Sequence, residues 1–363
     1  MTLIYFAIVL GLIVFVHELG HYIAARLTGV RVEVFSIGFG KRLFGWRRGD
    51  TDYRISIFPL GGYVRMSGII DESAGLPEGS GETLTGADWE FMSKNWLQKT
   101  FILAAGGVMN FALAWLIFAI LIGSTGINEA DNQPVIGQVS PEWPAAEAGL
   151  LAGDRLLTLN GLQLDSWSDI SSAVHAYPGE DIVLTVERSG EVFCDTITTR
   201  AEKILIDGHL REVGLIGIAP SLTHRQVSLI ESFSLAGSRS YDLLGLSAMQ
   251  LVILVRGEAS MRDLGGPIFI AQLSGEAARD GLVSFLSFIA IISLHIGFLN
   301  LLPLPVLDGG HIVITTVEAL IRRPLSFKLK LRIQQLGLVL LLFLMVIAMR
   351  NDLLRAGLFG SGG

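Results

Sequence analysis

The sequence predicts a polytopic α-helical membrane protein with an inserted β-rich domain. Of its 363 residues 51% are hydrophobic and only 17% are charged, and the mean hydropathy is +0.55. A soluble domain typically has about 25% charged residues. The apolar excess falls into four runs, at residues 1–25, 101–122, 285–306 and 336–349. Because roughly 20 residues at 1.5 Å per residue cross a hydrocarbon core of about 30 Å, we expect four transmembrane helices.

Charge and cysteine content exclude several classes of function. The net charge of −7 and the lack of a basic tract argue against nucleic acid as a partner. Cys194 is the single cysteine, so neither an intramolecular disulfide nor a cysteine zinc cluster is possible.

The distribution of basic residues predicts the orientation in the membrane. Ten Lys and Arg lie within 26–99 and five within 322–332, whereas acidic residues outnumber basic ones about two to one within 123–284. By the positive-inside rule the two basic loops are cytoplasmic and the acidic segment is external.

The external segment contains a predicted soluble domain. Short β-rich runs alternate with Gly, Pro and Asn over 133–220, with one helix expected at 168–176. The string from Gly137 to Leu150, followed by residues 153–157 and 160–161, resembles the PDZ domain of bacterial proteases. This resemblance implies that a peptide adds as a strand between the helix and a groove strand. That groove strand comprises Val135, Ile136, Gly137, Gln138 and Val139. A PDZ-shaped spacer that binds no peptide and only restricts access is the alternative.

The sequence His17-Glu18-Leu19-Gly20-His21 lies inside the first apolar run. Positions i and i+4 of a helix differ by about 40° of rotation and about 6 Å of rise, so His17 and His21 share a face and can share a metal ion. Glu18 is next to the first ligand and can reach a water at the metal. On an exposed helix such a match can be fortuitous, but ionisable groups at membrane depth are costly and functional by default. The motif therefore predicts a Zn²⁺ site with Glu18 as its catalytic residue.

Asp308 is the candidate third ligand, since catalytic zinc has three protein ligands and keeps a fourth position for water. It ends an apolar run in a segment, 300–311, whose two prolines and two glycines disfavour a regular helix. Irregular backbone at membrane depth occurs where it is buried in protein or lines a wet cavity. A turn or helix-capping aspartate is the alternative for Asp308.

The paired motifs resemble the site-2 protease family of intramembrane zinc metalloproteases. They are His-Glu-Leu-Gly-His at 17–21 and Asn-x-x-Pro-x-Pro-x-Leu-Asp-Gly at 300–309. The fragments 106–111 and 265–268 and the PDZ insertion are similar to its bacterial RseP-like branch. That branch has two tandem PDZ domains, whereas this chain has room for one. The resemblance implies a multi-pass protein of the bacterial inner membrane, with a periplasmic PDZ domain and an active site near the cytoplasmic side.

These observations predict nine segments. They are the first transmembrane helix (1–25), a cytoplasmic loop with a membrane-associated β-hairpin (26–99), the second transmembrane helix (100–123), the periplasmic PDZ domain (124–220), periplasmic interfacial helices (221–283), the third transmembrane segment (284–311), a cytoplasmic loop (312–334), the fourth transmembrane helix (335–350) and a periplasmic tail (351–363).

Topology constrains how many spans the chain has. His17 and His21 lie near the end of the first span, and Asp308 just past the end of the third, so they meet only if both spans run in the same direction. A crossing by the apolar run 241–255 would place Asp308 on the opposite side. That run is about 15 residues long, which suits an interfacial or buried helix better than a span.

The zinc chemistry predicts the mechanism. Such a site lowers the pKa of its water to about 7, and Glu18 would take the water proton and deliver it to the departing amine. By resemblance Asn300 holds the substrate backbone or the oxyanion, with an interhelical hydrogen bond as the alternative. For His311 a supporting or capping role is favoured over metal ligation, and His295 is expected to be a buried, hydrogen-bonded histidine.

Two β-rich runs, 32–39 and 53–64, flank a polar turn at 47–50 and predict a membrane-dipping hairpin. A transmembrane substrate has to unwind before water attacks its amide. An unpaired hairpin edge would capture the unwound segment as a strand, and we expect that edge at Ile55, Ser56, Ile57 and Phe58.

The predicted function is an intramembrane zinc endopeptidase that cleaves single-span membrane proteins within the lipid bilayer. By resemblance the substrates are anti-sigma factors, cut after a first periplasmic cleavage, and spent signal peptides. General clearance of membrane peptides is a second enzymatic interpretation. A metal-binding scaffold that presents a PDZ domain is the non-enzymatic one, and it does not require Glu18.

Overall fold

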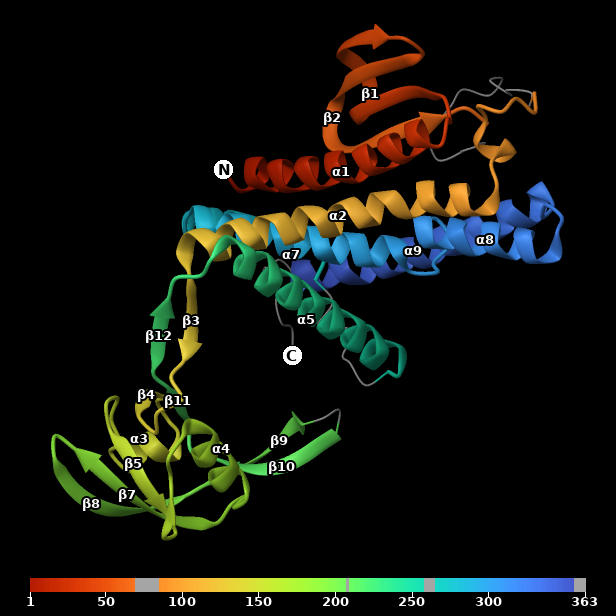
Figure 1. The fold of residues 1–363 in the computed structure, drawn as a ribbon. Helices are drawn as coiled ribbons and strands as arrows, with labels where there is room; N and C mark the ends of the chain where they lie inside the picture. The colour runs from red at the N-terminus through yellow and green to blue at the C-terminus, as the bar shows by residue number, and fades with distance from the viewer. Residues whose placement is uncertain (69–84, 207–208, 258–264, 356–363) are drawn as a thin grey trace. The chain divides into compact units, whose positions relative to one another are not determined.

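The structure is a computed structural model that describes residues 1–68, 85–206, 209–257 and 265–355. It consists of two compact units (Figure 1), a helical unit made of Met1–Ser124 and Ser228–Gly363, and a β-rich unit made of Thr125–Val227. Each unit is described by itself.

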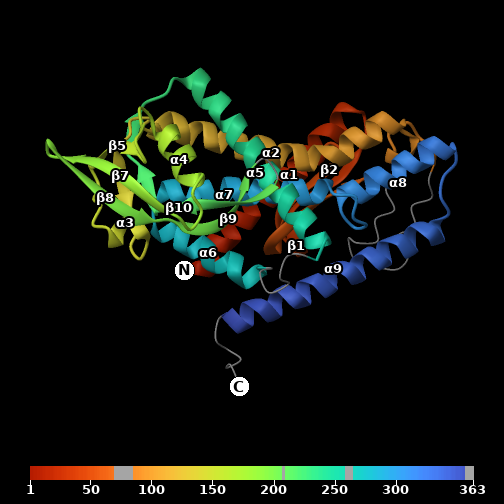
Figure 2. The same cartoon turned by 90° about the horizontal axis from the view of Figure 1, so that it is seen from below.

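Four helices of the helical unit are long and apolar enough to cross a membrane. They are α1 (Thr2–Leu27), α2 (Trp96–Thr125), α7 (Leu282–Leu301) and α9 (Phe327–Arg355). The four predicted spanning helices are thereby confirmed in length and composition over the described residues. The last of them, α9, extends well beyond the expected 335–350 and runs back from α8 along this unit (Figure 2).

Small residues bring the spanning helices close together. A Cβ on Gly20 of α1 would lie 2.3 Å from the carbonyl oxygen of Ala105 on α2, and one on Gly107 would lie 3.0 Å from the carbonyl oxygen of Gly297 on α7. Lipid provides no hydrophobic driving force between helices, so close backbone packing is a main source of their association. The glycines thus fix where α2 meets α1 and α7.

The predicted short helix at 241–255 is part of a longer helix, α5 (Leu229–Val255, 27 residues). The helix begins before the apolar run, at Leu229, where the Ser228 hydroxyl caps it by accepting a hydrogen bond from the backbone N–H of Glu231. It contacts α2 where Trp115 Nε1 donates to the carbonyl of Phe233 at 2.9 Å. The apolar run 241–255 is the C-terminal part of this helix, and α5 is not among the described helices that are long and apolar enough to span a membrane.

The expected periplasmic tail from residue 351 begins as helix, because α9 continues to Arg355. Asp352 is 3% exposed and accepts hydrogen bonds from the backbone N–H groups of Gly266, Ile268 and Phe269 at 2.9–3.0 Å. These groups form the N-terminus of α6 (Pro267–Arg279), whose free donors and dipole favour a carboxylate. Asp352 therefore joins the end of α9 to α6.

The predicted hairpin forms from β1 (Val32–Arg48) and β2 (Thr51–Met66), and both strands double back on themselves. The register places four segments side by side in the order 62–66, 32–37, 51–56 and 42–48. Ile55 pairs with Ile37 on one side and with Phe44 on the other. The prediction of an unpaired edge beginning at Ile55 was therefore wrong, because Ile55 lies in an interior strand.

The β-rich unit packs around one hydrophobic core. Its central sheet has the order β6-β5-β7-β8, and α4 carries a capping box between Ser166 and Asp169. Core residues include Ile136, Leu156 and Leu184, each buried. The elements are β3 (Ile127–Ala130), β4 (Ile136–Val139), α3 (Pro144–Glu147), β5 (Arg155–Leu159), β6 (Leu162–Gln163), α4 (Trp167–His175), β7 (Asp181–Arg188), β8 (Glu191–Thr198), β9 (Arg200–Ile206), β10 (His209–Leu215), β11 (Ile218–Pro220) and β12 (Leu222–Arg225).

The expected peptide groove along Val135 to Val139 is occupied by the chain itself. Val139, Gln138 and Ile136 pair with β11, and the N–H and C=O of Ile136 also bond to Asp154 and Gly153. A peptide strand cannot add where both sides of Ile136 are already paired. The prediction of β4 as the groove strand was wrong for this reason.

Asp154 provides a test of the stability of the β-rich unit. It is 1% exposed and accepts two hydrogen bonds of 2.7 Å from Arg188, which hold the pKa of this carboxyl below its usual range. A depressed folded-state pKa stabilises the fold above the unfolded pKa of about 3.9, and that contribution is lost as pH falls through the folded value.

We therefore expect hydrogen exchange of the peptides spanning 155–198 in the full-length protein, corrected for intrinsic rates, to accelerate as pH falls below about 4. Asp154→Asn should reduce this dependence and cost about 2 kcal/mol at pH 7, the worth of a charged hydrogen bond. An Asp154→Asn variant with the acid sensitivity of the wild type would contradict the assignment.

Candidate metal centre

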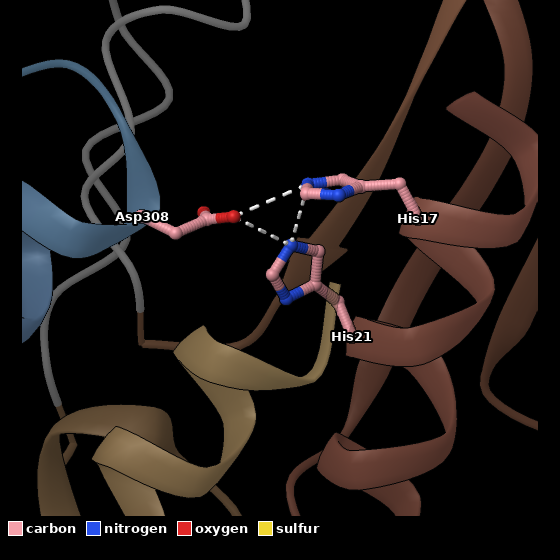
Figure 3. Close-up of side chains that lie close together, drawn as sticks. All are labelled: His17, His21 and Asp308. Carbon is pink, nitrogen blue, oxygen red and sulfur yellow. Dashed lines mark hydrogen bonds and ion pairs between the residues drawn. The ribbon is translucent and has the colours of Figure 1, made fainter. Parts of the chain in front are cut away.

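Three side chains from two helices converge on one point (Figure 3). Nε2 of His17 and Nε2 of His21 lie 3.2 Å and 3.4 Å from Oδ2 of Asp308, and 3.2 Å from each other. Among the described residues this is the group of His, Cys, Asp and Glu that could hold a metal ion. The structure thus brings the three sequence-predicted ligands together, although Asp308 comes 287 positions after His21 in the chain.

Helix α1 aims both imidazoles at α2, where Gly106 leaves room for them. A Cβ on Gly106 would lie 2.5 Å from Nε2 of His21 and 2.6 Å from Cε1 of His17. Real Cβ contacts are not that short, so this position requires glycine. The i, i+4 spacing of His17 and His21 and the absence of a side chain at Gly106 together make room for the site.

Asp308 is positioned by a break in the helical backbone. Helix α7 ends at Leu301 and α8 (Asp308–Ile321) begins at Asp308, so the expected third transmembrane segment 284–311 is two helices with an irregular link. In that link Val306 has φ +85°, a conformation that β-branched residues rarely adopt. A Cβ on Gly309 would lie 2.2 Å from the carbonyl oxygen of Leu302, so glycine lets the link fold against the start of α8.

The arrangement fits a zinc ion. A tetrahedron with metal–ligand bonds of 2.0–2.1 Å has edges of about 3.3–3.4 Å, which matches the separations of the three atoms. Oδ2 of Asp308 is buried without a hydrogen-bond partner, a costly state for a carboxylate unless a cation lies against it. Two imidazoles and one carboxylate are also a known donor set for catalytic zinc.

The outer nitrogens of both imidazoles have partners. Nδ1 of His21 donates to the carbonyl oxygen of Ile102 at 2.9 Å, which leaves Nε2 as the lone-pair nitrogen. Nδ1 of His17 lies 3.4 Å from the side-chain amide of Asn110, which is fully buried and whose Oδ1 has no partner. Rotating the Asn110 side-chain amide by 180° exchanges its oxygen and nitrogen. Oδ1 of Asn110 would then accept a hydrogen bond from Nδ1 of His17, so that both atoms have a partner.

Asn110 was not predicted as a site residue. It lies in the second apolar run, and a single asparagine there has no spacing relation to another ligand. The usable signal was its polarity at membrane depth. The carbonyl of Ile102 carries no sequence signal at all.

We expect Asn110→Ala to lower zinc affinity about 10- to 100-fold, the usual effect of removing a partner of a metal-bound histidine. Competition with a fluorescent chelator measures this. Asn110→Asp keeps an acceptor and should retain most of the affinity. Equal affinities for Asn110→Ala and wild type would show that the amide does not orient His17.

Glu18 lies beside the three ligands and against the hairpin. A Cβ on Gly62 would lie 3.3 Å from the Cγ of Glu18, and Val64 lies two residues further along the same segment. Both residues belong to the 62–66 segment, which pairs on one side with 32–37. The edge of the hairpin nearest Glu18 is therefore 62–66.

The remaining predicted residues lie elsewhere. Ser56 is buried and its hydroxyl lies 3.1 Å from that of Ser36, while Ile57 is exposed. Asn300 is half-buried in the last turn of α7. His295 is hydrogen-bonded between helices, with Nδ1 donating to Ile291 O at 2.7 Å and Nε2 lying 3.1 Å from the Ser247 hydroxyl. His311 lies in the first turn of α8.

The sequence model of a known protein family, Peptidase family M50, matches residues 5–344 of the chain. The chain belongs to this family. It is therefore a membrane protein of a metalloprotease family, and the matched range includes both the HExxH helix and Asp308.

Relatives of this M50 protein are similar over almost their whole length. A protein from Agrobacterium fabrum, named as a zinc metalloprotease, is 38% identical over 96% of this chain and 94% of its own. One from Rhizobium meliloti, with the same kind of name, is 36% identical over 96% and 95%. Protease RseP of Yersinia pestis is 32% identical over 96% and 98%, in an alignment of 455 positions that is longer than this chain.

Part of the chain also aligns with a solved structure. A PDZ domain of an SdrC-like protein from Listeria monocytogenes aligns with 25% of this chain and 90% of its own, at 18% identity and a TM-score of 0.20. No assignment rests on that likeness.

Proposed function

We propose that this M50 protein is a zinc endopeptidase that hydrolyses peptide bonds within transmembrane segments of single-span proteins. The observation that carries the proposal is the triangle of His17, His21 and Asp308 with Glu18 beside it, inside helices apolar enough to span a membrane. Ligands alone would suit a scaffold or a transporter. The adjacent carboxylate is what peptide hydrolysis requires.

The residues divide the chemistry between them. His17, His21 and Asp308 would hold the zinc ion, which would supply a Lewis acid to polarise the scissile carbonyl and acidify a water molecule. Glu18 removes a proton from the water as its oxygen attacks the carbonyl carbon. It then gives the proton to the amide nitrogen as the C–N bond breaks, so that a carboxylic acid and an amine leave.

Substrate binding is proposed at the 62–66 edge rather than at Ile55 to Phe58. A scissile peptide has to be extended before water reaches it, and an added strand on a sheet edge holds it so. The 62–66 edge runs past Glu18, whereas Ile55 is enclosed on both sides. Asn300, at the end of α7, is proposed as a contact to the substrate backbone, with a helix-to-helix hydrogen bond as the alternative role.

The edge is tested at Val64. Val64→Pro removes a backbone N–H from this edge, so cleavage should fall about 10-fold, the worth of one net hydrogen bond of about 1–1.5 kcal/mol. Val64→Ala keeps the N–H and should cleave at nearly the wild-type rate. Equal cleavage by the two variants, with zinc content unchanged, would remove this edge from the mechanism.

The location and substrates are also part of the proposal. The basic loops support a bacterial inner-membrane protein whose β-rich unit is periplasmic and whose site lies near the cytoplasmic side. Single-span proteins such as an anti-sigma factor, shortened by an earlier periplasmic cut, are the proposed substrates. Remnant signal peptides are the second class. For the β-rich unit, peptide binding at the edge of β11 and a purely restrictive role stay as alternatives.

The experiment is cleavage of single-span model proteins by the full-length protein in liposomes. We expect cleavage within the transmembrane segment, loss of activity with 1,10-phenanthroline and recovery on adding zinc. Cleavage only of soluble peptides, or activity that survives zinc removal, would overturn the proposal. Comparing membrane proteomes of wild type and Glu18→Gln cells would then separate anti-sigma factors from signal peptides as natural substrates.

A further inference from the structure

Two hollows lie along one face of α1, away from the metal site. The first, of about 280 Å³, is lined by apolar and aromatic side chains of α1 and the hairpin, together with Arg54, whose guanidinium pairs with Asp52 at 2.7 Å. Phe15, Leu19 and Tyr22 form its helical wall, and Trp46 stacks on Tyr53 at 5.4 Å on the hairpin side. Trp46 is 54% exposed, so this hollow opens at the surface of the helical unit.

The second hollow, of about 360 Å³, is basic and lies at the C-terminal end of α1. Arg26, Arg31, Asp50 and Trp89 line it, and the guanidinium of Arg31 lies 5.8 Å from the Trp89 ring centre. Nζ of Lys94 would lie 3.5 Å from a Cβ on Gly29, at the rim. The hollow therefore combines an aromatic wall with cationic groups.

The charge of the basic hollow is not balanced by its own residues. Arg31 pairs with Asp50 at 2.8 Å. In the described parts of the chain the ion pairs of this region are Arg31 with Asp50 and Arg65 with Glu33, and neither includes Arg26 or Lys94. Two positive charges thus remain for an anionic ligand.

The two hollows share one stripe of α1. Positions 15, 19, 22 and 26 recur at helical spacing on one face, so Phe15, Leu19 and Tyr22 lead directly to Arg26. Leu19 and Arg26 are about 10 Å apart along the axis at 1.5 Å per residue. An apolar hollow that ends in a cationic one at this distance matches a lipid, whose acyl chain begins close to its phosphate.

We propose that this stripe binds one anionic phospholipid. Its phosphate lies between Arg26 and Lys94 with Trp89 beside it, and one acyl chain lies against Phe15, Leu19 and Tyr22 under the hairpin. Basic pockets at helix ends bind lipid phosphates in this way. A peptide occupant is disfavoured because the hollow lies on the far side of 32–37 from the open edge 62–66. The proposal does not depend on proteolysis.

Native mass spectrometry of the full-length protein from mixed micelles tests it. We expect one retained phosphatidylglycerol and weak retention of phosphatidylcholine with the same chains. Arg26→Gln with Lys94→Gln should weaken retention about 30-fold, since each basic residue contributes about 1 kcal/mol next to a lipid phosphate. The matched control is Arg323→Gln with Lys328→Gln, two exposed residues of the other basic loop, and it should bind as the wild type does.

Two further arms separate a lipid from a free phosphate. Ile37→Phe narrows the apolar hollow and should lower retention without changing zinc content, and glycerol phosphate should not compete at the same concentration. Equal retention of the two lipids, or unchanged retention in the Arg26 and Lys94 double variant, would overturn the proposal. Full competition by glycerol phosphate, with no effect of Ile37→Phe, would overturn it as well, because it would show a headgroup site without a chain.

Discussion

Glu18→Gln should lower proteolysis by about 10²–10⁴-fold while the purified protein keeps its full zinc content. Glutamine has the shape of glutamate but takes no proton from water. The histidines and Asp308 are untouched, so the metal stays bound. Cleavage of a single-span substrate in liposomes and zinc content by mass spectrometry measure the two parts of the prediction.

Glu276→Gln is the matched control, because Glu276 is an exposed carboxylate on α6 outside the site. It should have the activity of the wild type. If Glu18→Gln still cleaves, Glu18 is not the base. If Glu18→Gln loses its zinc, Glu18 is a ligand and the assignment of three ligands is wrong.

Gly106→Ala should remove zinc and activity together, with a loss of zinc affinity of about 100-fold or more, at the upper end of effects from residues around a metal site. Its Cβ would lie 2.5 Å from Nε2 of His21 and 2.7 Å from Nε2 of His17. Either the imidazoles turn away or α2 moves back from α1. In both cases the triangle with Asp308 is lost.

Gly245→Ala is the control for a glycine-to-alanine change in a helix of the same unit, since a Cβ there meets no heavy atom within 4 Å. It should leave zinc content and cleavage unchanged, and stabilise α5 slightly. If Gly106→Ala binds zinc as tightly as Gly245→Ala does, the close approach of α2 to the histidines is not what shapes the site.

The spanning helices and the ligands were predictable because their signals are local. An apolar run of about 20 residues fixes a helix and its environment. The spacing of His17 and His21 fixes a shared face. Asp308 could be singled out because it is a carboxylate at the end of an apolar run, in a segment whose prolines and glycines disfavour a regular helix. The direction of the spans was consistent with its meeting both histidines.

The features that the sequence did not predict depend on long-range packing. The hairpin edge was misplaced because β1 doubles back near Gly38 and Gly40, whose φ values are +86° and +89°, and β2 doubles back near Gly61, whose φ is +136°; this puts Ile55 inside the sheet. The groove along β4 was misplaced because β11, about 80 residues later, pairs with it. Asn110 was missed because only the fold brings it to His17.

Extended X-ray absorption fine structure (EXAFS), measured at the zinc K-edge on the purified full-length protein, tests the metal centre most directly. The structure predicts two imidazole nitrogens and oxygen donors at about 2.0–2.1 Å. Three results would contradict a centre built from His17, His21 and Asp308: a sulfur ligand at about 2.3 Å, fewer than two imidazole ligands, or no bound zinc after the purified protein has been reconstituted with zinc.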